Sequence, residues 1–361
     1  MECLLEMKVL HFISAPAAGG AEVYVKDLVR CATKNGNNTA VVFLGDSESI
    51  GRCNDYQKKY LSELEQLGIK YYFLKKGSRR NIFSGLISFK KILTEYSPDI
   101  IHCHLFYAVF YSMFFSRKIV YTHHNIMIKI NRSVFRFFDC FIDTYVGICG
   151  VCSKMLKCHT NKPVVQINNA IDPERIKAKS GVTKRKKINI IMVGGLIEQK
   201  NYFLALESML YLKGYDYQLL IAGEGGLRSD IENKILEYQL QDNVKLMGNI
   251  SDINQFYSKG DIFLMTSKWE GLPIALIEAS IRGIPVVVTD VGGCSEVVHN
   301  MQNGYVVDEL SPELISKSLK KLIDTPKDRE DIRNIASVRK GVYEISAAYK
   351  SHYELYSRLL S

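Results

Sequence analysis

Residues 269–279 read Trp269-Glu270-Gly271-Leu272-Pro273-Ile274-Ala275-Leu276-Ile277-Glu278-Ala279, and they join a predicted strand to a predicted helix. The run 261–266 before them is mostly apolar and rich in strand formers, and Pro273 stands where a helix can begin without losing a backbone hydrogen bond. After it, Arg282-Gly283 suit a helix end, and the apolar run 286–289 suits a second strand. The stretch therefore predicts a strand–helix–strand unit of a parallel α/β fold.

The same stretch carries polar groups suited to a ligand. The free N–H groups of Gly271, Leu272 and the first helical turn would point out at the carboxyl end of the sheet, where the helix dipole favours an anion such as phosphate. Glu270 and Glu278 cannot favour the same anion, so we expect them to accept hydrogen bonds from ligand hydroxyls, which sugars and riboses carry. For either glutamate alone, a solvated position is the alternative interpretation.

The whole chain has the organisation of two α/β domains. Its 361 residues, 47% hydrophobic and 24% charged, suit a globular protein with two cores. Apolar runs typical of buried parallel strands alternate with helical patterns, and the basic segment 177–187 separates the halves. We expect ligand in the crevice between two doubly wound domains, at the carboxyl ends of the strands. The predicted strands are 8–13, 39–44, 70–74, 100–103, 119–122, 144–148 and 164–167, then 188–193, 218–222, 244–247, 262–265, 286–289 and 304–307.

Targeting signals and cysteines indicate a cytoplasmic protein. Residues 1–6 are too short and acidic for a signal peptide, and the longest apolar run, 105–115, is shorter than the roughly 20 residues that span a bilayer. The nine cysteines, an odd number, indicate reduced thiols. Cys149-Gly150-Val151-Cys152 with Cys158-His159 could imitate part of a zinc site, but no second pair matches it, so we expect no metal.

The net charge of +9 is concentrated in one segment. No acidic residue lies between Glu65 and Glu95, and apolar residues are interleaved with the basic ones at helical spacing over 70–93. Two interpretations remain open: peripheral contact with an anionic membrane, or the solvated face of an ordinary core helix. No nucleic-acid motif accompanies the charge, so we expect no nucleic-acid partner. The basic residues are Lys70, Lys75, Lys76, Arg79, Arg80, Lys90 and Lys91.

Six further motifs follow one another along nearly the whole chain. They are Gly19-Gly20-Ala21-Glu22, Asn168-Asn169-Ala170-Ile171-Asp172, Met192-Val193-Gly194-Gly195-Leu196 with Lys200, Ala222-Gly223-Glu224-Gly225, Gly248-Asn249-Ile250 and Gly292-Gly293-Cys294-Ser295-Glu296. Together with segment 267–280, in which Glu270 and Glu278 stand in an E-x7-E arrangement, they resemble the motifs of retaining GT-B glycosyltransferases of the family 4 type. The resemblance implies a GT-B fold of two Rossmann-like domains, an acceptor domain at 1–167 and a nucleotide-sugar donor domain at 168–341. It also implies that a helix at 342–361 packs back on the first domain.

The resemblance implies catalytic roles for three residues. Thr122-His123-His124-Asn125 matches the family's T-x-H-D pattern except at Asn125, and places His124 near the transferred sugar. A structural histidine is the alternative, and His102 and His104, at another strand end, are supporting candidates only. Lys200 would hold the diphosphate as the sugar bond breaks, and Glu270 would accept a hydrogen bond from a sugar hydroxyl.

It also implies a binding set for the donor. Gly194, Gly195, Gly271, Leu272, Pro273 and Ile274 would line the diphosphate, Asn249 and Ile250 would contact the base, and Glu278 the ribose. Gly19 and Gly20 would let the backbone approach a donor phosphate or the acceptor. This pair is not a G-x-G-x-x-G, which weighs against a nicotinamide dehydrogenase.

One residue departs from the family's pattern. Gly195 stands where the family usually carries Arg, so one phosphate contact worth on the order of 2 kcal/mol is missing, unless a neighbour such as Arg228 replaces it.

The reaction implied is retaining, metal-independent and cofactor-independent transfer of a hexosyl or N-acetylhexosaminyl group. The donor would be a nucleotide sugar, UDP- or GDP-linked, and the acceptor a glycan or a polyprenyl-linked glycan. We expect a role in bacterial surface polysaccharide biosynthesis (capsule, O-antigen or lipopolysaccharide), in the cytoplasm or at the inner face of the cytoplasmic membrane. A paired-carboxylate hydrolase is disfavoured, since its acids must flank the scissile bond. A nucleotide-sugar epimerase of similar fold and a non-catalytic nucleotide-sugar-binding subunit, the latter suggested by Gly195, remain as alternatives.

Overall fold

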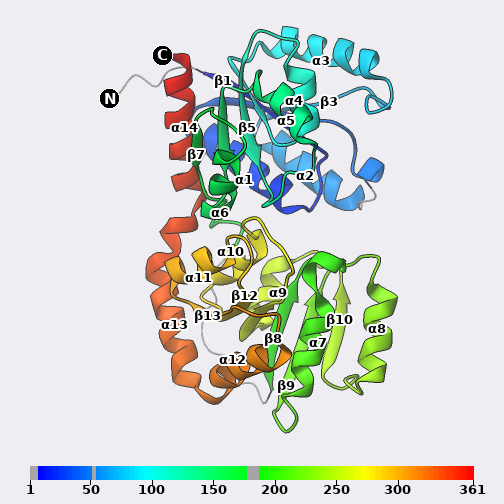
Figure 1. The fold of residues 1–361 in the computed structure, drawn as a ribbon, viewed down its shortest axis with the longest axis vertical. Helices are drawn as coiled ribbons and strands as arrows, with labels where there is room; N and C mark the ends of the chain where they lie inside the picture. The colour runs from blue at the N-terminus through cyan, green and yellow to red at the C-terminus, as the bar shows by residue number, and fades with distance from the viewer. Residues whose placement is uncertain (1–6, 51–53, 177–186) are drawn as a thin grey trace. The chain divides into compact units, whose positions relative to one another are not determined.

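The computed structural model describes residues 7–50, 54–176 and 187–361 (Figure 1). The expected connection at 177–187 therefore lies, except for Lys187, outside the described residues. The chain divides into two compact units, one of Met1–Asp172 with Ile345–Ser361 and one of Pro173–Glu344.

The division falls at Asp172 rather than at residue 167, because the intervening residues are bonded to the first unit. The backbone N–H of Asp172 donates to Oδ2 of Asp27 at 3.1 Å, and Nε of Arg30 lies 3.1 Å from Oδ2 of Asp172. The backbone N–H of Ile345 donates to the carbonyl of Ile171 at 2.9 Å. The terminal helix α14 (Ile345–Leu360) thus begins on the first unit, where it packs against helix α1 (Gly20–Lys34).

The first unit is a seven-stranded sheet in the order β3-β2-β1-β4-β5-β6-β7, with every neighbouring pair parallel. Its strands are β1 (Lys8–Ile13), β2 (Asn38–Phe43), β3 (Lys70–Phe73), β4 (Ile100–Cys103), β5 (Lys118–His123), β6 (Thr144–Gly147) and β7 (Val164–Gln166). Its helices are α1 (Gly20–Lys34), η1 (Glu48–Ile50), α2 (Asn54–Gln66), α3 (Ile82–Tyr96), α4 (Phe106–Ser112), α5 (Arg132–Asp139), α6 (Gly150–Lys157) and α14 (Ile345–Leu360).

The second unit is a six-stranded parallel sheet in the order β10-β9-β8-β11-β12-β13. Its strands are β8 (Ile188–Val193), β9 (Tyr217–Ala222), β10 (Val244–Gly248), β11 (Ile262–Met265), β12 (Val286–Thr289) and β13 (Gly304–Val307). Its helices are η2 (Glu198–Lys200), α7 (Tyr202–Leu210), α8 (Arg228–Glu237), α9 (Ile253–Lys259), α10 (Ile274–Ile281), α11 (Cys294–Met301), α12 (Pro312–Asp324), α13 (Pro326–Arg339) and η3 (Lys340–Tyr343).

The central strands are buried on both faces, which explains their almost continuous apolar sequences. All four residues of β4, β6, β11 and β12 are buried. Helices cover both sides of such a sheet, so polar side chains gather where the strands end. The expected class, two doubly wound α/β domains, is confirmed. None of the helices in the described part of the chain is long and apolar enough to cross a bilayer.

Each sheet has one point where the chain order reverses direction. In the first unit it lies between β1 and β4, and in the second between β8 and β11. At such a point the loops that leave the two strands diverge to opposite faces, which opens a crevice at the carboxyl edge. The loops that follow these four strands are therefore where a ligand site is expected in each unit.

Candidate functional site

The reversal point of the second unit is bridged by a buried ion pair. Lys200 lies in η2, beyond β8, and Glu270 in the loop after β11; Nζ of Lys200 is 2.6 Å from Oε1 of Glu270. Their side chains are 17% and 6% exposed. Ser267 Oγ also donates to Oε1, at 2.8 Å, and Gln199 Nε2 to Oε2, at 3.2 Å. Two residues expected in the site are thus in direct contact, and Oε2 keeps room for another donor.

Gly194 makes room for the lysine. A Cβ at this residue, whose φ is +158°, would lie 2.9 Å from Cε of Lys200. The hydroxyl of Tyr202 donates to the Gly194 carbonyl at 2.8 Å and fixes the loop. The glycine therefore lets the lysine stem cross the end of β8 toward Glu270.

The loop before α10 is held by a second loop of glycines. The backbone N–H of Gly293 donates to the carbonyl of Gly271 at 2.7 Å. A Cβ on Gly292, which has φ +58°, would lie 1.9 Å from the carbonyl oxygen of Glu270, so only glycine fits there. Pro273 is the N-cap of α10. In the described part of the chain, the N–H groups of Ile274 and Ala275 have no acceptor, so this helix start is open to an anion.

Glu278, about one turn into α10, is 6% exposed and is already paired. Arg175 Nη1 contacts Oε1, and the hydroxyl of Tyr257 donates to Oε2 at 2.7 Å. Burial, and then the charge of Glu278, raise the pKa of Tyr257 well above its usual value, so this hydroxyl remains a donor. Since a carboxylate has about four lone-pair sites, Glu278 keeps acceptor capacity for ligand hydroxyls. No sequence signal linked Arg175 or Tyr257 to it.

Other expected donor-binding residues lie on neighbouring loops. Asn249, which is exposed, and Ile250, which is half-buried, follow β10. This strand is at the edge of the sheet, and β9 lies between it and β8. Gly195 has open space around it, since a Cβ there would have its nearest neighbour 3.7 Å away, at the carbonyl of Glu224. Arg228, the suggested substitute cation, is paired with Glu224 and Glu232 and about one-third exposed.

The reversal point of the first unit carries a chain of histidines. His11 is in β1, and His104 and His124 follow β4 and β5. Nδ1 of His11 is 3.1 Å from Nε2 of His104, and Nδ1 of His104 is 3.0 Å from Nε2 of His124. His104 is thus hydrogen-bonded to His124. His11, which the sequence did not single out, is hydrogen-bonded to His104.

Two more histidines surround this chain. His102 in β4 lies 2.6 Å from both the Tyr356 hydroxyl and the Thr122 hydroxyl, one at each ring nitrogen. His352 of α14 is bonded through Nε2 to the hydroxyl of Tyr24 at 2.9 Å.

Burial keeps all five imidazoles neutral. It lowers the pKa of His11, His124 and His352 to about 3. Burial and the neighbouring imidazoles lower the pKa of His102 and His104 well below 6.5.

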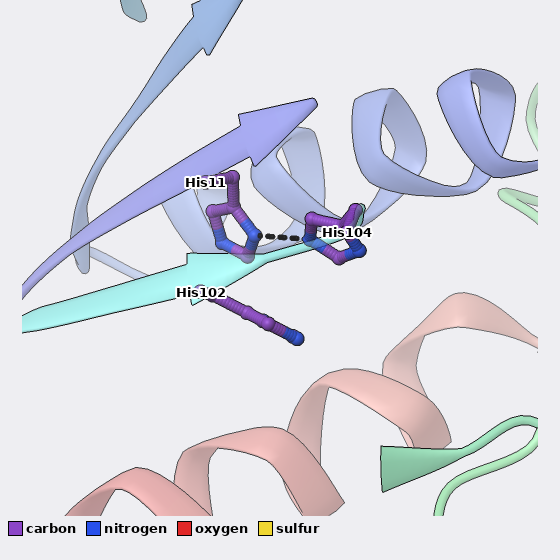
Figure 2. Close-up of side chains that lie close together, drawn as sticks. All are labelled: His11, His102 and His104. Atoms are coloured by element: carbon purple, nitrogen blue, oxygen red, sulfur yellow. Dashed lines mark hydrogen bonds between the residues drawn. The ribbon is translucent and has the colours of Figure 1, made fainter. Parts of the chain in front are cut away.

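The same cluster is the one set of side chains in the described part that could hold a metal ion. One ring nitrogen each of His11, His102 and His104 lies within 4.8 Å of the others. In Figure 2 a dashed line joins the rings of His11 and His104, and the ring of His102 lies close to both, with its centroid 4.2 Å from that of His104 and 5.1 Å from that of His11. Since both nitrogens of His102 already have hydrogen-bond partners, the three rings suit a hydrogen-bonded network better than a metal site. Cys149 and Cys152 are buried, with Sγ atoms 3.3 Å apart, and belong to no such set.

Gly19 and Gly20 form the N-cap and first residue of α1. A Cβ on Gly19 would lie 2.1 Å from Oε2 of Glu22. The other oxygen of this carboxylate, Oε1, accepts a hydrogen bond from the hydroxyl of Ser14. The Glu22 carboxylate therefore covers this helix start, and a hydroxyl-bearing ligand suits it better than a phosphate.

The basic segment 70–93 spans β3, a loop and most of α3. Phe89, Ile92 and Leu93 of α3 are buried in the core. On the same helix Phe83 is 80% exposed and Ile87 62% exposed. The six lysines and arginines at 75, 76, 79, 80, 90 and 91 are also exposed. The helix thus combines a core face with an outward apolar and basic surface.

Comparison with known proteins identifies similar sequences over both units. The family model Glycosyltransferase Family 4 matches residues 18–175, and Glycosyl transferases group 1 matches residues 173–339. The Staphylococcus aureus capsular polysaccharide biosynthesis glycosyltransferase CapH is 24% identical over 96% of this chain and 99% of its own. The Escherichia coli UDP-Gal:alpha-D-GlcNAc-diphosphoundecaprenol alpha-1,3-galactosyltransferase is 27% identical over 62% of this chain and 66% of its own.

For two other glycosyltransferases, the chain spans less than half of their own length, 44% and 47%. Among solved structures, Anabaena Alr3699/HepE in complex with UDP-glucose superposes with a TM-score of 0.81 over 98% of this chain and all of its own, at 17% identity. At that identity the likeness describes the fold.

Proposed function

We propose a donor site for this chain, which belongs to the group 1 and family 4 glycosyltransferases and is an enzyme that transfers sugars. Its second unit binds a nucleotide-diphosphate sugar at the Lys200–Glu270 pair. Its fold is GT-B. One of its relatives, CapH, acts in capsular polysaccharide biosynthesis.

The observation that carries the proposal is the arrangement around α10. The Lys200 ammonium group, on a side chain that is 17% exposed, is paired with Glu270 in the loop that leads to α10, and the first amides of α10, at Ile274 and Ala275, have no acceptor in the described residues. A diphosphate is an anion that both groups can bind. Lys200 then shares its charge between Glu270 and the diphosphate, and Glu270 turns its remaining lone pairs to a sugar hydroxyl. We propose a UDP- or GDP-linked sugar as the donor, and the complex of HepE with UDP-glucose supports the UDP-linked class.

For the mechanism, we assign to Lys200 the stabilisation of the departing diphosphate. Charge develops on the leaving oxygen as the bond to the sugar breaks, and a fixed ammonium group stabilises that charge. We propose that transfer proceeds with retention, as the resemblance to the retaining family implies, and without a metal, since Lys200 and the α10 amides supply the positive charge. NMR of the product's anomeric proton tests retention, and transfer in excess EDTA tests metal independence.

The donor proposal is tested by a thermal-shift screen of UDP-, GDP-, ADP- and dTDP-sugars. One donor class should raise Tm in wild type, and Glu278→Ala should lose most of that shift, because the ribose hydroxyls lose their carboxylate. We expect donor affinity to fall about tenfold, the effect of losing a hydrogen bond to a charged group.

Glu237→Ala, on the surface of α8, is the matched control and should bind as wild type does. Equal donor affinity in Glu278→Ala and wild type would remove Glu278 from the site.

The open space at Gly195 gives a gain-of-affinity prediction. Gly195→Arg should fold normally, because a Cβ there meets no atom closer than 3.7 Å, and the guanidinium should add a phosphate contact. We expect the donor Kd to fall about tenfold. Calorimetric titration with the donor measures this, with Gly195→Gln as the uncharged control. A weaker donor affinity in the arginine variant than in the glutamine variant would show that the diphosphate lies elsewhere.

For the acceptor, we propose a glycan on a lipid carrier, reached by peripheral contact of α3 with the inner face of the cytoplasmic membrane. The Escherichia coli relative acts on a diphosphoundecaprenol-linked sugar. The exposed Phe83 and Ile87, with Arg79, Arg80 and Lys90 around them, suit an anionic bilayer surface.

This surface predicts binding to anionic lipid. The chain should sediment with phosphatidylglycerol vesicles and not with phosphatidylcholine vesicles, and high salt should release it. Phe83→Ser/Ile87→Ser should reduce the bound fraction severalfold, whereas Leu236→Ser, an exposed apolar residue of α8, should not. Equal sedimentation of all three proteins would leave α3 as an ordinary core helix.

A further inference from the structure

The chain His11–His104–His124 restricts where its protons can lie. Each neutral imidazole has one N–H and one lone pair. Two contacts of 3.1 Å and 3.0 Å join the three rings, and each contact needs one donor and one acceptor. The two protons must therefore point in the same direction along the chain. Either all three rings are protonated on Nδ1, or all three are protonated on Nε2.

General imidazole chemistry favours the second arrangement. Histidine in water prefers the Nε2–H tautomer, and when His124 donates to His104 and His104 to His11, all three rings adopt it. The chain then ends with Nε2–H of His11, a residue that lines a cavity of about 20 Å³ together with Asn38 and Thr39. A cavity of that size holds about one water molecule, which can accept a hydrogen bond from this N–H group.

We propose that His104 and His11 are positioning residues that hold His124 as its Nε2–H tautomer, so that its Nδ1 offers a lone pair to a hydroxyl of the sugar acceptor bound to the first unit. Nδ1 of His124 is buried and has no partner in the described part of the chain, although buried ring nitrogens are normally hydrogen-bonded. The role of the hydroxyl rests on the proposed function, but the tautomer does not.

A metal ion is the competing use of these histidines. It would need a lone pair from His102, both of whose nitrogens are held by hydroxyl groups, and would replace the proton between His11 and His104. The hydrogen-bonded chain requires neither change, so we favour it.

The test is imidazole ¹⁵N NMR of the ¹⁵N-histidine-labelled protein, with the His124 signals assigned from His124→Gln. We expect His124 protonated on Nε2 and bare on Nδ1. In His104→Leu the His124 shifts should move to a mixture of tautomers, and kcat for transfer should fall about fivefold, the effect of one neutral hydrogen bond. His352→Leu removes an equally buried histidine outside the chain, and should leave the His124 shifts and kcat as in wild type.

Three results would overturn the inference: Nδ1–H at His124 in wild type, His124 shifts unchanged in a folded His104→Leu, or one-to-one Zn²⁺ uptake that shifts the His11, His102 and His104 signals. If His104→Leu does not fold, the wild-type tautomer alone decides. A correct tautomer in a protein that transfers no sugar would contradict the proposed function and leave the tautomer inference intact.

Discussion

Replacing Lys200 by methionine should lower kcat for sugar transfer about 10²–10³-fold, the effect of removing a fixed group that stabilises developing negative charge. The methionine keeps the stem that crosses Gly194 but removes the ammonium group 2.6 Å from Glu270. Initial rates at saturating donor, followed by release of the nucleoside diphosphate, measure the loss.

Two controls separate catalysis from stability. Loss of one partner from a buried ion pair costs about 3–5 kcal/mol, so Lys200→Met alone should lower Tm. Lys200→Met/Glu270→Gln removes the orphaned charge and should restore Tm without restoring kcat. Lys268→Met breaks the exposed pair with Glu198, which joins the same two loops at 3.0 Å, and should keep kcat within about twofold of wild type, as surface pairs contribute little. Equal rates in Lys200→Met and Lys268→Met would refute the catalytic role.

Acid should unfold the first unit at a mildly low pH. Burial lowers the pKa of His11, His124 and His352 from 6.5 to about 3. Between pH 6.5 and about 3 the unfolded chain therefore binds more protons at these residues than the folded chain, and stability falls as the pH falls. The neutral histidines contribute fully to the free energy of unfolding above about pH 6.5. Below that pH the free energy of unfolding falls by about 1.4 kcal/mol per pH unit for each histidine, or by about 4 kcal/mol per pH unit for the three.

Urea unfolding at a series of pH values measures this slope through the free energy of unfolding. His352→Leu should reduce the slope by the share of one histidine. A free energy of unfolding that is constant from pH 7 to pH 5 would show that these imidazoles are not held neutral.

The strands could be predicted because their burial leaves a direct signature. Parallel strands covered on both faces are short continuous apolar runs, and β1, β4, β8, β11, β12 and β13 have the predicted bounds, while the others differ by one residue at one end or both. The carboxyl-edge loops that carry Glu270 and His124 follow from those bounds, whereas Lys200, and the roles expected of all three residues, came from the family resemblance.

The partners of these residues could not be predicted, because they depend on register between distant segments. Arg175 and Glu278 are 103 residues apart, and His11 and His104 are 93 apart. No periodic pattern connects such positions. The sequence consequently suggested that Glu270 and Glu278 have free carboxylates for ligand hydroxyls. In the structure each carboxylate is already bonded to a cation and to a hydroxyl group of the same unit.

The central claim is that the reversal point between β8 and β11 holds the diphosphate of the donor. A crystal structure of the protein with the donor selected by the thermal-shift screen tests it most directly. We predict a phosphate oxygen within hydrogen-bond distance of Lys200 Nζ and of the Ile274 and Ala275 amides, with a sugar hydroxyl on Glu270. A well-ordered nucleotide sugar whose phosphates contact none of these groups would contradict it.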